Sequence, residues 1–153
     1  MRIVSLLPSA TELLCSIPGG EELLVGRSHE CDWPPSISDR PVLTGQHITA
    51  TSSSEIDSQV RDAIESHGSL YTLDAETLSS LQPDLILTQD LCTVCSIDLK
   101  TVQRIAAGMT PAPRVLNLNP SSIEDVLDEI AADKQLAESK GVELSADRAN
   151  DDP

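Results

Sequence analysis

Aromatic and basic side chains are scarce in this chain of 153 residues. It has one Trp, one Tyr and no Phe, so Leu, Ile, Val and Ala must fill the core of any fold that it adopts. Lys and Arg together number 10 against 25 Asp and Glu, which gives a formal net charge of −15. Such a charge argues against binding nucleic acid or anionic membranes through a basic face. An acidic surface with little lysine suits a high-salt environment, and it equally suits an ordinary acidic cytoplasmic protein.

Long apolar runs are also missing. No stretch approaches the roughly 20 apolar residues that a transmembrane helix needs, so we expect no insertion into a membrane. The apolar start at residues 3–7 is too short for the core of a signal peptide, and a helix start follows it where a cleavage site would stand. On these residues the chain is either cytoplasmic or a mature or truncated form of an exported protein.

Most catalytic fingerprints are absent. The sequence holds no P-loop, no G-x-S-x-G and no H-E-x-x-H motif. The glycine pair at 19–20 is expected to close a helix, so it does not open a dinucleotide-binding turn. Glu30 and Asp32 could serve acid–base chemistry, and Cys92 is a further candidate, but nothing designates a nucleophile. We therefore expect a protein that is not an enzyme.

The stretch from Pro83 to Cys95 has the pattern around which the rest of the chain is organised. An apolar run at 85–87 lies between turn signals, which predicts a short strand buried on both faces of a parallel sheet. Polar residues follow at 88–90, and then come two cysteines separated by two residues. In open α/β sheets, ligands bind beyond the carboxyl ends of the strands. These polar and sulfur groups therefore stand where binding or chemistry is expected.

Strand-like and helix-like segments alternate along the chain. A capping box at Ser9 and Glu12 is expected to begin the first helix, and residues 45–53 are expected to form an exposed loop. The alternation predicts a Rossmann-like α/β fold of three layers, in which helices cover both faces of a mostly parallel sheet. Besides the strand at 85–87, the expected strands are 3–7, 23–26, 42–43, 70–73 and 114–118, and the expected helices are 9–17, 54–64, 74–81, 99–107 and 123–130.

Two pairs of side chains have the residue types of metal ligands: His29 with Cys31, and Cys92 with Cys95. Each pair follows an expected parallel strand, so both would lie at the same edge of the sheet. One imidazole and three thiols suit tetrahedral zinc or an iron–sulfur cluster, which would make the chain an intracellular metal-binding or interaction module. The other interpretation is that Cys31 and Cys92 are packing or loop residues, as free cysteines often are.

The chain resembles the amino-terminal lobe of periplasmic cobalamin-binding proteins in three blocks. They are RIVSLLPSATELL at 2–14, LLVGRSHECDWPP at 23–35 and LQPDLILTQDLCTVC at 81–95, in the order and spacing of that family. Its members are substrate-binding proteins of ABC transporters, in the helical-backbone class that also carries ferric siderophores and haem. The resemblance runs from about residue 2 to residue 130. The S-H-E-C-D-aromatic-P and T-Q-D-x-C-x-V-C forms are similar to the subgroup that is labelled cobalamin-binding.

The resemblance implies one lobe of a two-lobed protein that holds its ligand in the cleft between the lobes. The implied ligand is cobalamin, another corrinoid or an iron chelate. The loops after the strands at 3–7, 23–26 and 85–87 would face the cleft. Where cobalamin-binding relatives place a Tyr that stacks on the corrin, this chain has Glu30, and Trp33 would supply the flat surface instead. The residues implied to line the cleft are Pro8, Ser9, Glu30, Trp33, Gln89 and Asp90.

The chain departs from this family pattern in two respects. No export signal or lipid anchor is visible in the 153 residues, although the family is periplasmic or extracellular, and these residues are expected to form only one of the two lobes. Residues 1–137 are expected to form the ligand-binding lobe, and residues 138–153 a polar, frayed tail where the helix that joins the lobes would begin. The implied partners are an ABC permease and a second copy of the chain. The copy would form a weak, salt-promoted homodimer through the uncovered face around Trp33.

Overall fold

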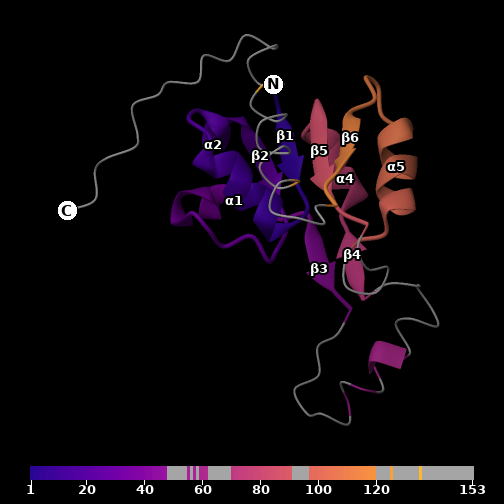
Figure 1. The fold of residues 1–153 in the computed structure, drawn as a ribbon. Helices are drawn as coiled ribbons and strands as arrows, with labels where there is room; N and C mark the ends of the chain where they lie inside the picture. Colours follow the sequence, from indigo (N-terminus) through magenta and orange to yellow (C-terminus); the bar gives the residue numbers. More distant parts are fainter. Residues whose placement is uncertain are drawn as a thin grey trace.

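Strands and short helices alternate through the residues that the computed structural model describes, which are 1–47, 55, 57, 59–61, 70–90, 97–119, 125 and 135 (Figure 1). None of the helices in this part of the chain has the length and apolar character needed to cross a bilayer. In chain order the elements are β1 (Ile3–Ser5), α1 (Pro8–Ser16), α2 (Gly20–Leu23), β2 (Leu24–Arg27), the 3-10 helix η1 (Pro35–Asp39), β3 (Thr44–Gln46), β4 (Tyr71–Leu73), α4 (Ala75–Ser80), β5 (Leu85–Thr88), α5 (Leu99–Ala107) and β6 (Arg114–Asn117).

Four of the strands form a parallel sheet in the order β2-β1-β5-β6. Ile3 of β1 pairs with Leu24 of β2 on one side and with Leu85 of β5 on the other. Leu85 in turn pairs with Arg114 of β6, so β1 and β5 are the two inner strands. β3 and β4 form a separate antiparallel pair. The mostly parallel α/β sheet predicted from the alternation of segments is confirmed.

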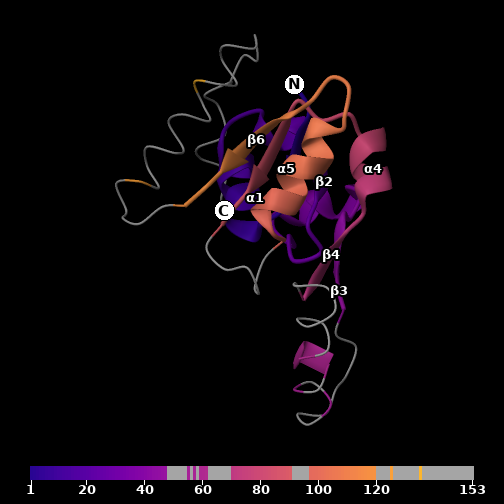
Figure 2. The same ribbon diagram turned by 90° about the vertical axis from the view of Figure 1, so that its right-hand side faces the viewer.

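Helices cover both faces of this sheet and give three layers. α1 and α2 lie on one face, and α4 and α5 lie on the other (Figures 1 and 2). Consecutive strand residues point into different layers, as the pleat of a strand requires. Ile3 packs with the cluster under α1 and α2, whereas Val4 packs with the cluster under α4 and α5. β5 is buried at all of its positions, which confirms the strand that the apolar run at 85–87 predicted.

Two expectations about the first helical region are wrong. α1 begins at Pro8, with Leu7 as its N-cap and no side-chain cap, so Ser9 lies inside the helix and does not cap it. Proline favours the first helical position because its fixed φ suits the helix and its missing N–H would have no partner there. The glycine pair at 19–20 does more than close a helix. Gly19 has a left-handed φ of 79°, and Gly20 begins α2.

The expected edge strand and the expected loop after it also differ from the structure. Val42 makes only an isolated parallel bridge with Arg27. The strand proper is Thr44–Gln46, which pairs with β4, so the first part of the expected loop at 45–53 is a strand. Its three residues are Thr, Gly and Gln, so no alternation of apolar side chains marks the strand in the sequence. Of the expected helix at 54–64, residues 55, 57 and 59–61 are described and are helical, whereas of the expected helix at 123–130 only residue 125 is described.

Candidate functional site

The order of the strands produces a change of direction between β1 and β5. From β1 the chain moves to β2 on one side, and from β5 it moves to β6 on the other. The connections after β1 and β5 therefore turn away from each other at the carboxyl edge of the sheet, which is where open α/β sheets bind ligands. Pro8 and Ser9 stand at the start of the first connection, and Gln89 and Asp90 stand at the start of the second. Four of the predicted lining residues thus follow two adjacent strands.

The amino terminus of α1 comes directly after β1 at this edge. Its N-cap, Leu7, has no side-chain cap, and its first turn contains no acidic residue. The N–H groups of the first turn lack partners within the helix, and this end of the helix carries partial positive charge. Ser9 is exposed and Pro8 is half-buried. The end of α1 therefore suits an uncharged or negative oxygen atom of a ligand.

Residues 28–41 form an irregular loop between β2 and β3, which we call the Trp33 loop. The backbone of Arg27 closes its base. The Arg27 N–H donates to the carbonyl of Pro41 at 3.0 Å, and the Arg27 carbonyl accepts from the N–H of Leu43 at 2.9 Å. The two ends of this irregular segment are thus held side by side, as in the compact surface loops that often carry function.

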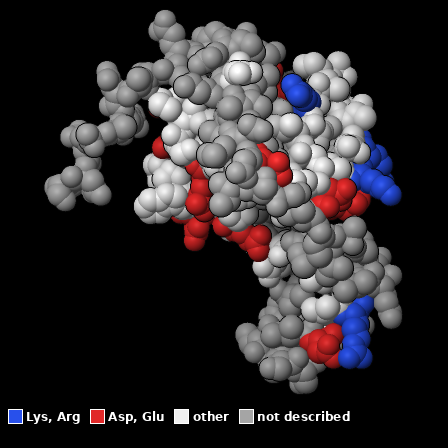
Figure 3. All heavy atoms as spheres, viewed as in Figure 1, with Lys and Arg blue, Asp and Glu red and all other residues white. Residues whose placement is uncertain are grey.

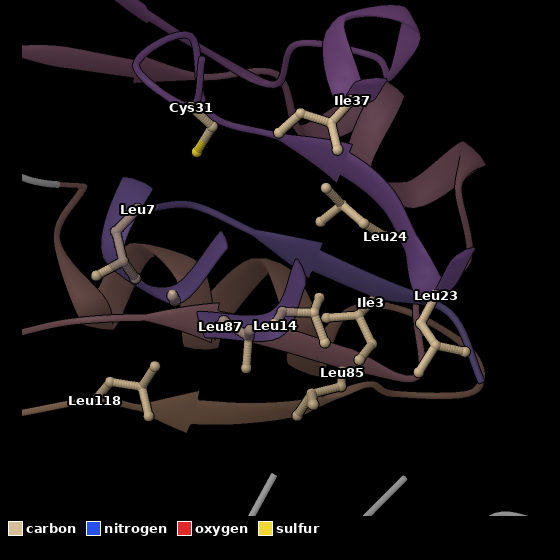
Figure 4. Close-up of a cluster of buried hydrophobic side chains, with 11 residues drawn as sticks. Ile3, Leu7, Leu14, Leu23, Leu24, Cys31, Ile37, Leu85, Leu87 and Leu118 are labelled. Atoms are coloured by element: carbon tan, nitrogen blue, oxygen red, sulfur yellow. The ribbon is translucent and has the colours of Figure 1, made fainter. Parts of the chain in front are cut away.

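Two buried side chains anchor the Trp33 loop to the body. Cys31 and Ile37 are 1% and 0% exposed and belong to the cluster under α1 and α2 (Figure 4). Trp33 stands between them in the sequence, and it is 60% exposed. The peptide bond that follows Trp33 is cis. An anchored loop therefore presents the sole indole of the chain to solvent.

Glu30 and His29 connect the Trp33 loop to the β3–β4 hairpin. The Tyr71 hydroxyl donates to Glu30 Oε1 at 3.2 Å, and the rings of His29 and Tyr71 lie 5.7 Å apart. Thr44 Oγ1 lies 2.7 Å from His29 Nδ1 and accepts the backbone N–H of His29 at 3.0 Å. Ser28 Oγ lies 2.8 Å from the same Thr44 oxygen. Sequence reasoning missed Thr44 and Tyr71, since no motif marks either residue and only the hairpin brings them here.

The ends of β5 and β6 are joined at the same edge. The N–H of Asp90 donates to Asn119 Oδ1 at 3.0 Å, and the N–H of Leu118 donates to the Thr88 carbonyl at 2.8 Å. Asp90 is exposed and Gln89 is half-buried. Asn119 was missed as a site residue, although the strand-end rule that selected Gln89 and Asp90 also selects the residues after the strand at 114–117.

The contacts of Cys31 are those of a thiol in a core. Its Sγ lies 3.0 Å from Thr11 Oγ1 of α1, and burial raises the pKa of the Cys31 thiol, which favours the protonated form. In the described part of the chain no three His, Cys, Asp or Glu side chains are grouped to hold a metal ion. Cys92 and Cys95 lie outside the described residues. The metal-ligand set of these cysteines with His29 stays a prediction.

Carboxylates dominate the charge of the loops that follow β1, β2, β5 and β6. Glu30, Asp32 and Asp90 are exposed there. Two guanidinium groups lie among the described residues here: Arg40 is paired with the Asp39 carboxylate at 3.0 Å, and Arg27 at the end of β2 donates to carbonyls of the Trp33 loop. Figure 3 shows acidic side chains around and below α1, and on the α5 side both acidic and basic side chains. This edge of the sheet therefore favours a neutral or positively charged ligand over a polyanion.

No protein-family model and no curated protein sequence matches the chain. Solved structures do match its fold. The periplasmic heme-binding protein HutB of Vibrio cholerae is 22% identical with a TM-score of 0.59, over 92% of this chain and 42% of that protein. The periplasmic vitamin B12-binding protein BtuF of Vibrio cholerae is 17% identical with a TM-score of 0.55, over 91% of this chain and 48% of that protein. A Staphylococcus epidermidis protein described as a possible iron-binding, periplasmic solute-binding protein is 24% identical with a TM-score of 0.57, over 92% of this chain and 43% of that protein.

These matches confirm, at the level of the fold, the resemblance to one lobe of a periplasmic substrate-binding protein. The chain spans less than half of the length of each of these three proteins. At identities this low the likeness concerns the course of the backbone and not the residues that contact a ligand.

Proposed function

We propose that this chain is a ligand-binding lobe for a metal chelate, in the substrate-binding component of an ABC importer. The observation that carries the proposal is the fold shared with three such proteins over at least 91% of the chain. The four parallel strands bring polar loops to one edge of that fold, which supports binding there. Its working compartment is then the periplasm or the cell exterior, its macromolecular partner is an ABC permease, and its role is binding and not catalysis.

A corrinoid such as cobalamin is the ligand class that suits this edge best. A corrin ring carries carboxamide side chains, whereas haem carries propionate carboxylates, which the exposed Glu30, Asp32 and Asp90 would repel. The free N–H groups at the start of α1 suit carboxamide oxygens. The exposed indole of Trp33 offers a flat apolar surface for a ring. The proposed contact residues are Pro8, Ser9, Glu30, Trp33, Gln89 and Asp90.

Titration calorimetry of the folded chain with cyanocobalamin and with ferric haem tests this proposal. One lobe covers about one side of its ligand, so we expect weak, saturable binding of cyanocobalamin and still weaker binding of haem, in titrations that reach high micromolar ligand. If haem bound more tightly than cyanocobalamin, the corrinoid assignment would be wrong, but the broader proposal of a chelate-binding lobe would still hold. No binding of either ligand to a chain shown to be folded would overturn direct binding by this lobe.

Two variants locate the binding edge. Trp33→Ala should weaken the binding of cyanocobalamin several-fold, because stacking of aromatic rings contributes about 0.5–1.5 kcal/mol beyond the area that it buries. Glu22→Gln is the control, since Glu22 is exposed in α2, which precedes β2 at the opposite edge of the sheet. It removes one negative charge and should leave the affinity unchanged. Equal effects of the two variants would place the ligand elsewhere.

The metal-ligand set predicted from the sequence, His29, Cys31, Cys92 and Cys95, has a separate test. Protein purified without a metal-affinity step is examined by elemental analysis. Stoichiometric zinc or iron that is lost in the Cys92→Ser, Cys95→Ser double variant would support the set. A metal-free wild type whose stability a chelator does not change would contradict it.

A further inference from the structure

The side chain of Arg27 fills the inside of the Trp33 loop. Its Nη1 donates to the carbonyl of Cys31 at 2.9 Å and to that of Ser28 at 3.3 Å. Its Nη2 donates to the carbonyl of Ser38 at 3.3 Å. The accepting carbonyls come from the segments before and after Trp33, so one guanidinium joins the two halves of the loop.

The anchoring of the loop does not serve the packing of Trp33 itself. Cys31 and Ile37 are buried on either side of it in the sequence, and the Cys31 thiol points toward the apolar cluster (Figure 4). Trp33 remains 60% exposed, so most of its indole gains nothing from the hydrophobic effect in this state. An ordered loop with an exposed aromatic ring is the arrangement expected of a preformed contact surface.

We propose that Arg27 is a positioning residue for ligand binding, which fixes the Trp33 loop before the ligand arrives and so prepares the indole for stacking. The inference rests on the proposed chelate-binding function. Ordering a loop at the moment of binding would cost affinity, and a loop that is ordered beforehand avoids this loss. The planar guanidinium can direct several N–H groups at separate carbonyls, whereas the ammonium group of Lys is a compact point charge.

A role for Arg27 in global stability alone is the competing explanation. The Nε atom of Arg27 is buried and has no hydrogen-bond partner among the described residues, which offsets part of what the Nη bonds contribute. A positioning role predicts a change in the motion of the indole and in affinity through Trp33. A purely stabilising role predicts a change in unfolding without these local effects.

The sole Trp of the chain makes the first arm of the test specific, because all indole fluorescence comes from this loop. Time-resolved anisotropy of the ligand-free protein measures nanosecond motion of Trp33 in the wild type, Arg27→Met and Arg27→Lys. Both variants should show a larger fast component than the wild type. Arg40→Met is the matched control, because it removes a positive charge that the same loop uses on the Asp39 carboxylate and should leave the anisotropy unchanged. Far-UV circular dichroism verifies folding, and Arg27→Lys carries the test if Arg27→Met does not fold.

The second arm measures the affinity for cyanocobalamin with and without Trp33. Arg27→Met should weaken binding roughly 2–10-fold when Trp33 is present, and by less than about twofold in the Trp33→Ala background. An equal loss in both backgrounds, or an unchanged anisotropy of Trp33 in a folded Arg27 variant, would overturn the inference. If the wild type binds no chelate, the proposed function fails, while the anisotropy arm still decides whether Arg27 holds Trp33 in place.

Discussion

Replacing Gly20 by Ala sets two effects of opposite sign against each other. Gly20 is buried at the start of α2, and a Cβ atom there would overlap the carbonyl oxygen of Leu14 in α1 and lie 2.9 Å from its carbonyl carbon. Because the obstacle is backbone, no change of rotamer relieves it. Ala is a better helix former than Gly by about 1 kcal/mol, but overpacking costs about 1–3 kcal/mol and occasionally more. We expect the overlap to dominate and the free energy of unfolding to fall, by up to roughly 2 kcal/mol.

Urea denaturation followed by circular dichroism measures this change, and Gly108→Ala is its control. Gly108 caps α5 with φ −81° and ψ −8°, a conformation open to any residue, and an added Cβ would meet its nearest atom, the Ile105 carbonyl oxygen, at 3.4 Å. Ala there should raise the free energy of unfolding by about 0.4–1 kcal/mol, because it restricts the unfolded chain. A Gly20→Ala protein as stable as the wild type would refute the close approach of α1 and α2.

Burial raises the pKa of the Cys15 thiol from 9.0 to about 11. Cys15 of the folded protein should therefore resist alkylation at pH 9, and its contribution to stability should be lost as the pH rises toward 11. Alkylation of Cys15 as fast in the folded protein as in urea would contradict this. Hydrogen bonds from Thr77 lower the pKa of Asp74, the N-cap of α4, below 3.8. Their stabilisation is present above that pH and lost as the pH falls through the lowered value, so Asp74→Ala should lower the melting temperature at pH 7 more than at acid pH. An equal fall in melting temperature at pH 7 and at acid pH would contradict the role of Asp74 as a charged N-cap. Trp33 should support a weak homodimer that salt strengthens by screening the charge of −15. Sedimentation across a salt series measures it, and a monomer throughout, or a dimer unchanged by Trp33→Ala, would exclude it.

Elements with a local signal could be predicted from the sequence, and elements defined by their neighbours could not. The apolar run Leu85–Leu87 and the capping residue Asp74 identify β5 and α4 because strand burial and capping act within a few residues. α2 was not predicted, because its start depends on the left-handed turn at Gly19 and on contact with α1. β3 was not predicted either, because only its pairing with β4 makes this segment a strand.

The same distinction holds for the site. Gln89 and Asp90 follow directly from the strand-end rule, and the structure does bring them to the carboxyl edge of the sheet. Thr44 contacts His29, and Tyr71 contacts Glu30. Each pair is far apart in the sequence, so no local pattern predicts either contact. The Arg27 guanidinium was unremarkable in the sequence for the same reason, since its acceptors are backbone carbonyls, which every residue has.

The position of β1 inside the sheet has a consequence for the chain during its synthesis. β1 is made before β5, but Ile3 pairs with Leu85 and the N–H of Arg2 bonds to Asp84, 82 positions later. Synthesis adds roughly 5–20 residues per second, so one edge of β1 lacks its neighbouring strand for seconds. During this time its N–H and C=O groups are unpaired and Val4 is not covered. Pairings of such range also close slowly. A ribosome that pauses before β5 is complete therefore holds a nascent chain with an open strand edge, to which another chain could pair.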